Sequence, residues 1–262
     1  MLPSSEGSIF FSHREFYTKK RNNNHNEMEL NRILFLDIET VPGAAKYDDL
    51  TEQMQALWDK KARTMSEFVN FSENSARELY NRAAIYAEFG KIVCISVGIF
   101  SGEKFVLHSF VDKDEKKLLQ DFVTRMGSWL CDNQHAICGH NAKEFDIPFI
   151  ARRLLVNGLK LPAMLDIAGK KPWEIPHIDT MELWKFGDYK HFTSLELLAT
   201  IFGLPTPKDD INGSQVGQVY WLDGDLQRIS TYCQKDVLTT ARLYLKLKGS
   251  DKEIPDTCVE IR

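Results

Sequence analysis

The chain has 262 residues, of which 43% are hydrophobic, and this is enough for one large domain with one substantial core. Lys and Arg number 33 against 37 Asp and Glu, so the formal net charge is −4. This acidic balance argues against a general nucleic-acid coating protein, which would carry a basic surface. It leaves room for an enzyme that grips a few nucleotides in a local cleft.

The five cysteines are an odd number and form no C-x-x-C pair. They favour a reducing compartment over a disulfide framework or a zinc site. No apolar run is long enough to span a bilayer, and the N-terminus lacks the apolar core of a signal peptide. We therefore expect a cytoplasmic protein.

Residues 1–30 are polar and have no sustained period, so we expect a disordered or loosely packed extension. From residue 33 the pattern is that of an α/β domain covering residues 31–248. The nearly continuous apolar run 33–38 predicts a central buried strand. Residues 92–100 and 105–111 are rich in β-forming residues, and Ser101-Gly102-Glu103 between them predicts a hairpin.

An insertion of about residues 43–90 separates the first two strands. Its apolar residues recur at helical intervals: Leu50, Met54, Leu57, Trp58, Met65 and Phe68. Ser75-Ala76-Arg77-Glu78 has the pattern of a capping box that opens a helix. The insertion either overhangs the active site or only packs on the edge of the sheet, and the sequence leaves both open.

Further helices and strands alternate along the rest of the chain. Helices are predicted at 114–131, from about Asp146 to Gly158, from the capping box at 193–196 to Gly203, and at about 226–247. Short strands are predicted at 136–139 and 177–179. Residues 249–262 are expected to form a C-terminal tail.

Four acidic residues lie in or beside apolar segments: Asp37, Glu39, Asp146 and Asp236. Residues i and i+2 of a strand point to the same face, so Asp37 and Glu39 project together. An unpaired buried carboxylate is expensive, and two buried like charges repel. Carboxylates suit hard cations such as Mg²⁺ or Mn²⁺. A two-metal carboxylate site suggests phosphodiester hydrolysis.

Tyr232 lies four residues before Asp236 on the last predicted helix. This spacing puts both side chains on one face, with attachment points roughly 5–6 Å apart. A phenol with an ordinary pKa near ~10 is a poor general base. Its role is then to orient a water whose acidity a metal has already raised.

Three motifs together resemble those of the DEDDy 3′→5′ exonucleases: Asp37-Ile38-Glu39-Thr40, Asn141–Asp146 with Ile147-Pro148, and Tyr232–Asp236. The middle motif is similar to that of the proofreading domain of B-family DNA polymerases. The resemblance covers about residues 31–247. It implies a ribonuclease H-like α/β fold, with a mixed five-stranded sheet flanked by helices and a helical insertion after the first strand.

The resemblance also implies two divalent metals, Mg²⁺ or Mn²⁺, with Asp37, Glu39, Asp146 and Asp236 as ligands and Tyr232 positioning the water. These five are the implied catalytic residues. Position 231 is Thr, so the Tyr-using subclass fits and the subclass with His five residues before the last Asp does not.

Four neighbouring residues become substrate contacts by the same resemblance: Ile38, Thr40, Asn141 and Phe145. Strand alternation points Ile38 to the opposite face, into packing. A turn Asn and a core Phe are equally good interpretations of Asn141 and Phe145. The run 208–214 resembles a loop of free-standing bacterial exonucleases, and its alternative is a turn-rich surface loop.

The function that follows is stepwise 3′→5′ hydrolysis of single-stranded nucleic acid, DNA favoured over RNA, to nucleoside 5′-monophosphates. Two alternatives remain. One is a haloacid dehalogenase-type phosphatase, whose motif Asp37–Val41 half matches, with Glu39 in place of the second Asp. The other is a catalytically silent nucleic-acid-binding module.

Overall fold

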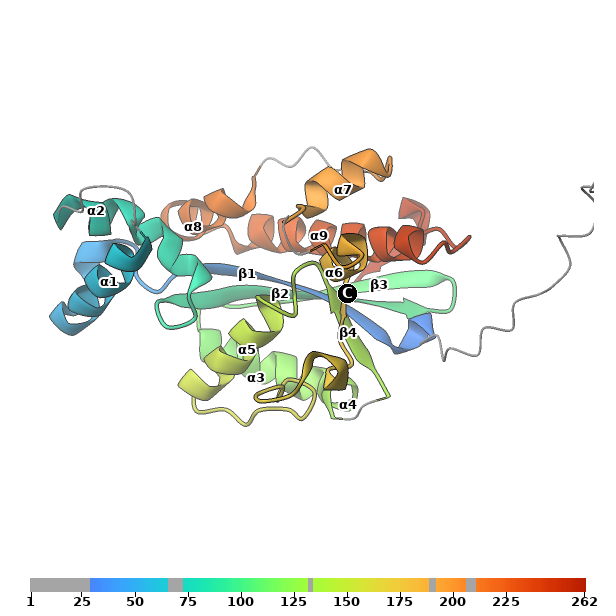
Figure 1. Cartoon of the computed structure of the whole chain (residues 1–262), viewed down its shortest axis with the longest axis horizontal. Helices are drawn as coiled ribbons and strands as arrows, with labels where there is room; N and C mark the ends of the chain where they lie inside the picture. Colours follow the sequence, from blue (N-terminus) through green and yellow to red (C-terminus); the bar gives the residue numbers. More distant parts are fainter. Residues whose placement is uncertain (1–28, 66–72, 132–133, 189–191, 206–210) are drawn as a thin grey trace, which may run out of the picture.

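The computed structural model describes residues 29–65, 73–131, 134–188, 192–205 and 211–262. The extension expected over residues 1–30 lies almost wholly outside the described residues, as do Phe68 and the first part of the 208–214 loop. The described chain forms one mixed sheet with helices on both faces (Figure 1).

The sheet has six strands in the order β5-β4-β1-β2-β3-β6. The strands are β1 (Ile33–Pro42), β2 (Gly90–Ser101), β3 (Lys104–Val111), β4 (Ala136–Gly139), β5 (Ile178–Asp179) and β6 (Val259–Ile261). β1 and β3 each pair antiparallel with β2, whereas β4 pairs parallel with β1 and with β5. The expected α/β class, a mixed sheet flanked by helices, is confirmed, but the described residues form six strands rather than the expected five, the extra one being β6.

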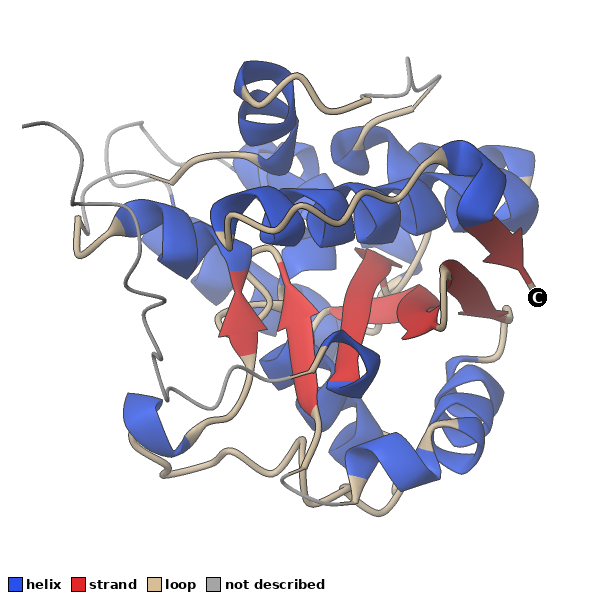
Figure 2. Cartoon of the chain, turned by 90° about the vertical axis from the view of Figure 1, so that its right-hand side faces the viewer, coloured by secondary structure: helices blue, strands red, loops and turns tan. Residues whose placement is uncertain are grey.

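Two helical layers sandwich the sheet (Figure 2). One layer holds α3 (Glu115–Arg125), α4 (Gly127–Leu130) and α5 (Asp146–Val156), and the other holds α6 (Thr180–Lys185), α7 (Leu195–Ile201), α8 (Val216–Gln218) and α9 (Leu226–Leu247). The run 33–38 is apolar on both sides because β1 is covered on both sides. Leu36 and Ile38 pack toward α3 and α5, and Phe35 packs toward α9.

The long helix predicted at about 226–247 is confirmed as α9, capped by the Asp225 side chain. The helix predicted over 114–131 is two helices, because the chain breaks at Met126 and restarts at Gly127. Within the described residues, none of the helices is both long enough and apolar enough to cross a membrane.

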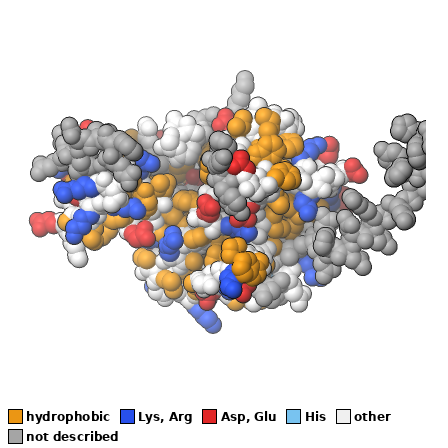
Figure 3. Space-filling view, in the orientation of Figure 1, with side chains coloured by type: hydrophobic (Ala, Val, Ile, Leu, Met, Phe, Trp, Pro, Cys, Tyr) orange, Lys and Arg blue, Asp and Glu red, His pale blue; other side chains and the backbone are white. Residues whose placement is uncertain are grey.

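The insertion between β1 and β2 is helical, with α1 (Glu52–Met65), α2 (Glu73–Glu78) and a 3-10 segment, η3 (Leu79–Ile85). It has its own small core around the fully buried Trp58, whose indole N–H donates to the Ala76 carbonyl at 2.8 Å. The capping box predicted at Ser75 is wrong, because α2 already begins at Glu73. In the space-filling view the insertion projects from the left of the body (Figure 3).

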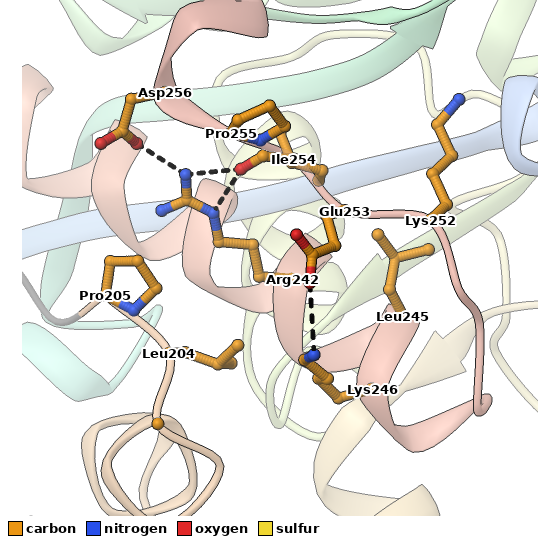
Figure 4. Close-up of a pocket in the computed structure, with 11 residues that line it drawn as sticks. Leu204, Pro205, Arg242, Leu245, Lys246, Lys252, Glu253, Ile254, Pro255 and Asp256 are labelled. Carbon is orange, nitrogen blue, oxygen red and sulfur yellow. Dashed lines mark hydrogen bonds and ion pairs between the residues drawn. The ribbon is translucent and has the colours of Figure 1, made fainter.

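Residues 249–262 pack against α9 and then run along the edge of the sheet, where β6 pairs parallel with β3. The Arg242 guanidinium donates to the Ile254 carbonyl at 3.0 and 2.7 Å and to Asp256 at 2.6 Å (Figure 4). These bonds hold the chain beside a cavity of about 270 Å³. The segment expected as a tail therefore supplies an edge strand.

Candidate active site

The first two carboxylates lie near the middle of β1, on the face covered by α9. Asp37 is opposite Ser96 and Glu39 is opposite Cys94 on β2. Asp37 is half-buried, and Glu39 is 7% exposed. The register shifts between Glu39 and Thr40, and such an irregularity re-aims a strand where a site is built.

Asp146 is the first residue of α5, and its side chain contacts β1. Its Oδ1 accepts the backbone N–H of Ile38 at 3.1 Å, across 108 residues of sequence. The side chain is 4% exposed. Its position is set by the turn before the helix, where Asn141 takes a positive φ of 66° and its carbonyl accepts the N–H of Phe145 at 3.0 Å.

Asp179, at the end of β5, holds that turn in place. One oxygen accepts the N–H groups of Asn141 at 2.9 Å and Met181 at 3.0 Å, and the other accepts that of Lys143 at 3.1 Å. Sequence reasoning took Asp179 only as part of a strand. The signal it passed over is an Asp directly before a helix, where Asp commonly caps.

The last helix brings Tyr232 and Asp236 to the same place. The Tyr232 hydroxyl is hydrogen-bonded to Asp236, as the i,i+4 spacing predicts. Between them Cys233 is buried, with its Sγ 3.3 Å from Oδ2 of Asp37. No local pattern in the sequence indicates this contact.

The carboxylates are electrically coupled. Burial raises the pKa of Asp37 well above its ordinary value, and the charges of Asp146 and Asp236 raise it further. Burial, with Asp37 and Asp236, does the same to the pKa of Glu39. Burial raises the pKa of Asp146 to about 7, partly offset by its backbone hydrogen bonds. Burial and the neighbouring acids also raise the pKa of Tyr232, so it stays protonated.

The four carboxylates and the phenol come from three separate segments of the chain: β1, α5 and α9. Residues 85–257 match the model of a family described as "Predicted 3'-5' exonuclease related to the exonuclease domain of PolB". The chain belongs to this family. Asp146, Tyr232 and Asp236 fall inside the matched residues, while Asp37 and Glu39 precede them.

Among solved structures, one similar chain is the RNase domain of the yeast Pop2 protein, an X-ray structure. It has 12% sequence identity and a TM-score of 0.36, and the match covers 88% of this chain and 81% of that one. The search of curated proteins gave no match. Family membership makes the chain a nuclease domain, and exonuclease domains of this kind use divalent metals.

The donor set fits such metals. Ligand atoms of Asp37, Glu39 and Cys233 all lie within 4.8 Å of one another. Asp146 and Asp236 are close enough to raise the pKa of Asp37. Carboxylate oxygens suit Mg²⁺ and Mn²⁺, and divalent charge would relieve the repulsion that raises these pKa values. The thiol is a softer donor at the edge of this set.

The four expected substrate contacts divide into two kinds. Thr40 is half-buried next to Glu39 and reaches the surface of a cavity described below. Ile38 is buried in the core on the opposite face, as strand alternation predicts, and only its N–H faces the site. Asn141 is a turn residue, and Phe145 packs on Phe149 with 5.4 Å between ring centroids.

Proposed function

We propose that this protein is a two-metal-dependent 3′→5′ exonuclease that releases nucleoside 5′-monophosphates from single-stranded nucleic acid, DNA favoured over RNA. The observation that carries the proposal is the coupled set of four buried or half-buried carboxylates with Tyr232 bonded to Asp236. Two divalent cations, Mg²⁺ or Mn²⁺, would supply charge neutralisation and an acidified water when bound.

Metal binding and water orientation would fall to different residues of the site. Asp37 and Glu39 from β1, with Asp236 from α9 and Asp146 from α5, would hold the metals. Tyr232 stays protonated and therefore acts through its hydroxyl as an orienting group for the water rather than as a base. The Ile38 N–H fixes the Asp146 carboxylate at 3.1 Å, which keeps that ligand in place.

The proposal includes a cytoplasmic location. All five cysteines are free, and Cys233 touches the metal-binding carboxylates. A reducing compartment would protect this thiol from oxidation.

The test uses single-stranded DNA and RNA, each labelled at its 5′ end, with Mg²⁺ or Mn²⁺. We expect a ladder that shortens from the 3′ end, faster for DNA. Asp37→Ala and Asp236→Ala should abolish hydrolysis and leave the fold intact, whereas Asp166→Ala, at an exposed aspartate in the loop after α5, should not.

Three results would contradict the proposal. Internal cuts would exclude an exonuclease. Activity on a small aryl phosphate with none on oligonucleotides would favour the phosphatase alternative. Metal-dependent binding without turnover would favour the silent module.

A further inference from the structure

A cavity of about 640 Å³ lies between the insertion and the chain segment that precedes α9. Arg82, Ile85 and their neighbours in η3 form one wall, and residues 213–222 form the other. The end of β1, at Thr40 and Pro42, also lines it. Its volume lies in the range of about 300–1,000 Å³ that is usual for ligand sites.

The cavity adjoins the carboxylates. Thr40, one of its lining residues, follows Glu39 directly. On the other wall, a Cβ placed on Gly213 would lie 4.0 Å from the Tyr232 hydroxyl oxygen. A ligand whose phosphate reached the carboxylate cluster would thus have its next groups at the mouth of this cavity.

The lining has the chemistry of a nucleotide site. Ile85 is 48% exposed and Leu222 is 72% exposed, and they stand on opposite walls. Gln218 and Arg82 are also exposed, and Arg82 has no ion pair among the described residues. Of the described residues that line the cavity, none is acidic. Apolar side chains can pack on the faces of unpaired bases, and a guanidinium without an ion-pair partner can bind a phosphate.

The cavity lies where the insertion meets the rest of the domain. The insertion and α8 lie side by side at one end of the sheet (Figure 1), and hydrophobic side chains gather on the surface where the insertion meets the body (Figure 3). A base held between two protein walls must be unpaired, because in a duplex its faces and edges are already occupied.

We propose that this cavity binds the unpaired nucleotides next to the scissile phosphate, with the insertion as one wall of the strand-binding site. This rests on the proposed exonuclease function and deepens it. The insertion then makes the enzyme selective for single strands, and the segment after residue 212 carries part of the substrate contact.

The test compares Ile85→Glu and Leu222→Glu with the matched control Leu155→Glu. Leu155 is 61% exposed near the end of α5, on the other face of the sheet. Binding of a fluorescein-labelled oligothymidylate is measured by anisotropy without metal, and KM is measured with Mg²⁺. Hydrolysis of bis(p-nitrophenyl) phosphate, which has no base, reports the carboxylate site alone.

Both cavity variants lose an apolar contact and place a negative charge beside the phosphates, so each should raise Kd and KM for the oligonucleotide by about tenfold or more, and the control by less than about twofold. Hydrolysis of the base-free ester should be the same in all. Cavity variants with the Kd and KM of the control would overturn the cavity proposal and leave the exonuclease standing. A wild type that neither bound nor cut the strand would overturn the exonuclease and the cavity with it.

Discussion

Replacing Asp146 with Asn should stabilise the metal-free protein at pH 8 while it removes a metal ligand. The carboxyl is buried, and its pKa in the folded chain is about 7, against an ordinary 3.8. The folded state therefore holds this proton more tightly than the unfolded state. The free energy of unfolding falls as the pH rises from about 4 through about 7.

The size of the effect follows from the shift. At about 1.36 kcal/mol per pH unit, the change from 3.8 to about 7 corresponds to about 4 kcal/mol at most. The gain in the variant should be smaller, because the pKa values of Asp37 and Glu39 are also raised and the three carboxyl groups share charge interactions. Asn keeps an oxygen in the position that accepts the Ile38 N–H, so no backbone group loses its partner.

The assay is urea unfolding in EDTA at several values between pH 5 and pH 8. The difference between variant and wild type should favour the variant at pH 8 and shrink as the pH falls. Mg²⁺ should raise the stability of the wild type and have little effect on the variant.

Asp179→Asn is the matched control, since Asp179 is 3% exposed and lies beside the same turn. Both of its oxygens accept backbone N–H groups, so an amide nitrogen in place of one of them costs about 1–3 kcal/mol. If Asp146→Asn lost as much stability at pH 8 as Asp179→Asn, the reasoning about the coupled carboxylates would be refuted.

Three further outcomes are expected. Tyr232→Phe should lower the rate of oligonucleotide hydrolysis by about ten- to a hundredfold, because only water orientation is lost; an unchanged rate would remove Tyr232 from the mechanism. Glu115→Ala should cost about 3–5 kcal/mol in chemical unfolding, since it leaves the Arg153 guanidinium, 2.5 Å from Glu115, without its carboxylate; a loss under 1 kcal/mol would contradict this. Trp58→Ala should lower the local stability of the insertion by about 3–5 kcal/mol, because it empties the centre of the small core there. Amide hydrogen exchange should become faster in the insertion, while α9 stays protected. Equally fast exchange through the whole chain would show that the insertion has no separate core.

Much of the fold could be predicted from local periodicity in the sequence. The apolar run at β1, the Asp37/Glu39 alternation and the i,i+4 pair on α9 each depend on residues close in sequence, and the structure has them as predicted. The same holds for the strand pair joined at Ser101–Glu103.

Local sequence patterns could not predict the contacts between distant segments. Cys233 meets Asp37 across 196 residues, and nothing near either residue distinguishes that thiol from an ordinary core cysteine. The three-residue β6 has too few residues to show a period, and its pairing with β3 depends on the path of the chain after α9. The capping pattern at Ser75 failed, because α2 already begins at Glu73.

The position of α9 also bears on how the chain acquires activity. It supplies Tyr232 and Asp236 and covers one face of β1, β2 and β3. Each pair of site residues that joins β1 to α9 closes a loop of about two hundred residues, and contacts that close long loops form slowly. A chain that has folded only as far as α5 would present an open sheet face and an incomplete ligand set. Under the proposed function, hydrolysis would therefore require that α9 has docked on the sheet.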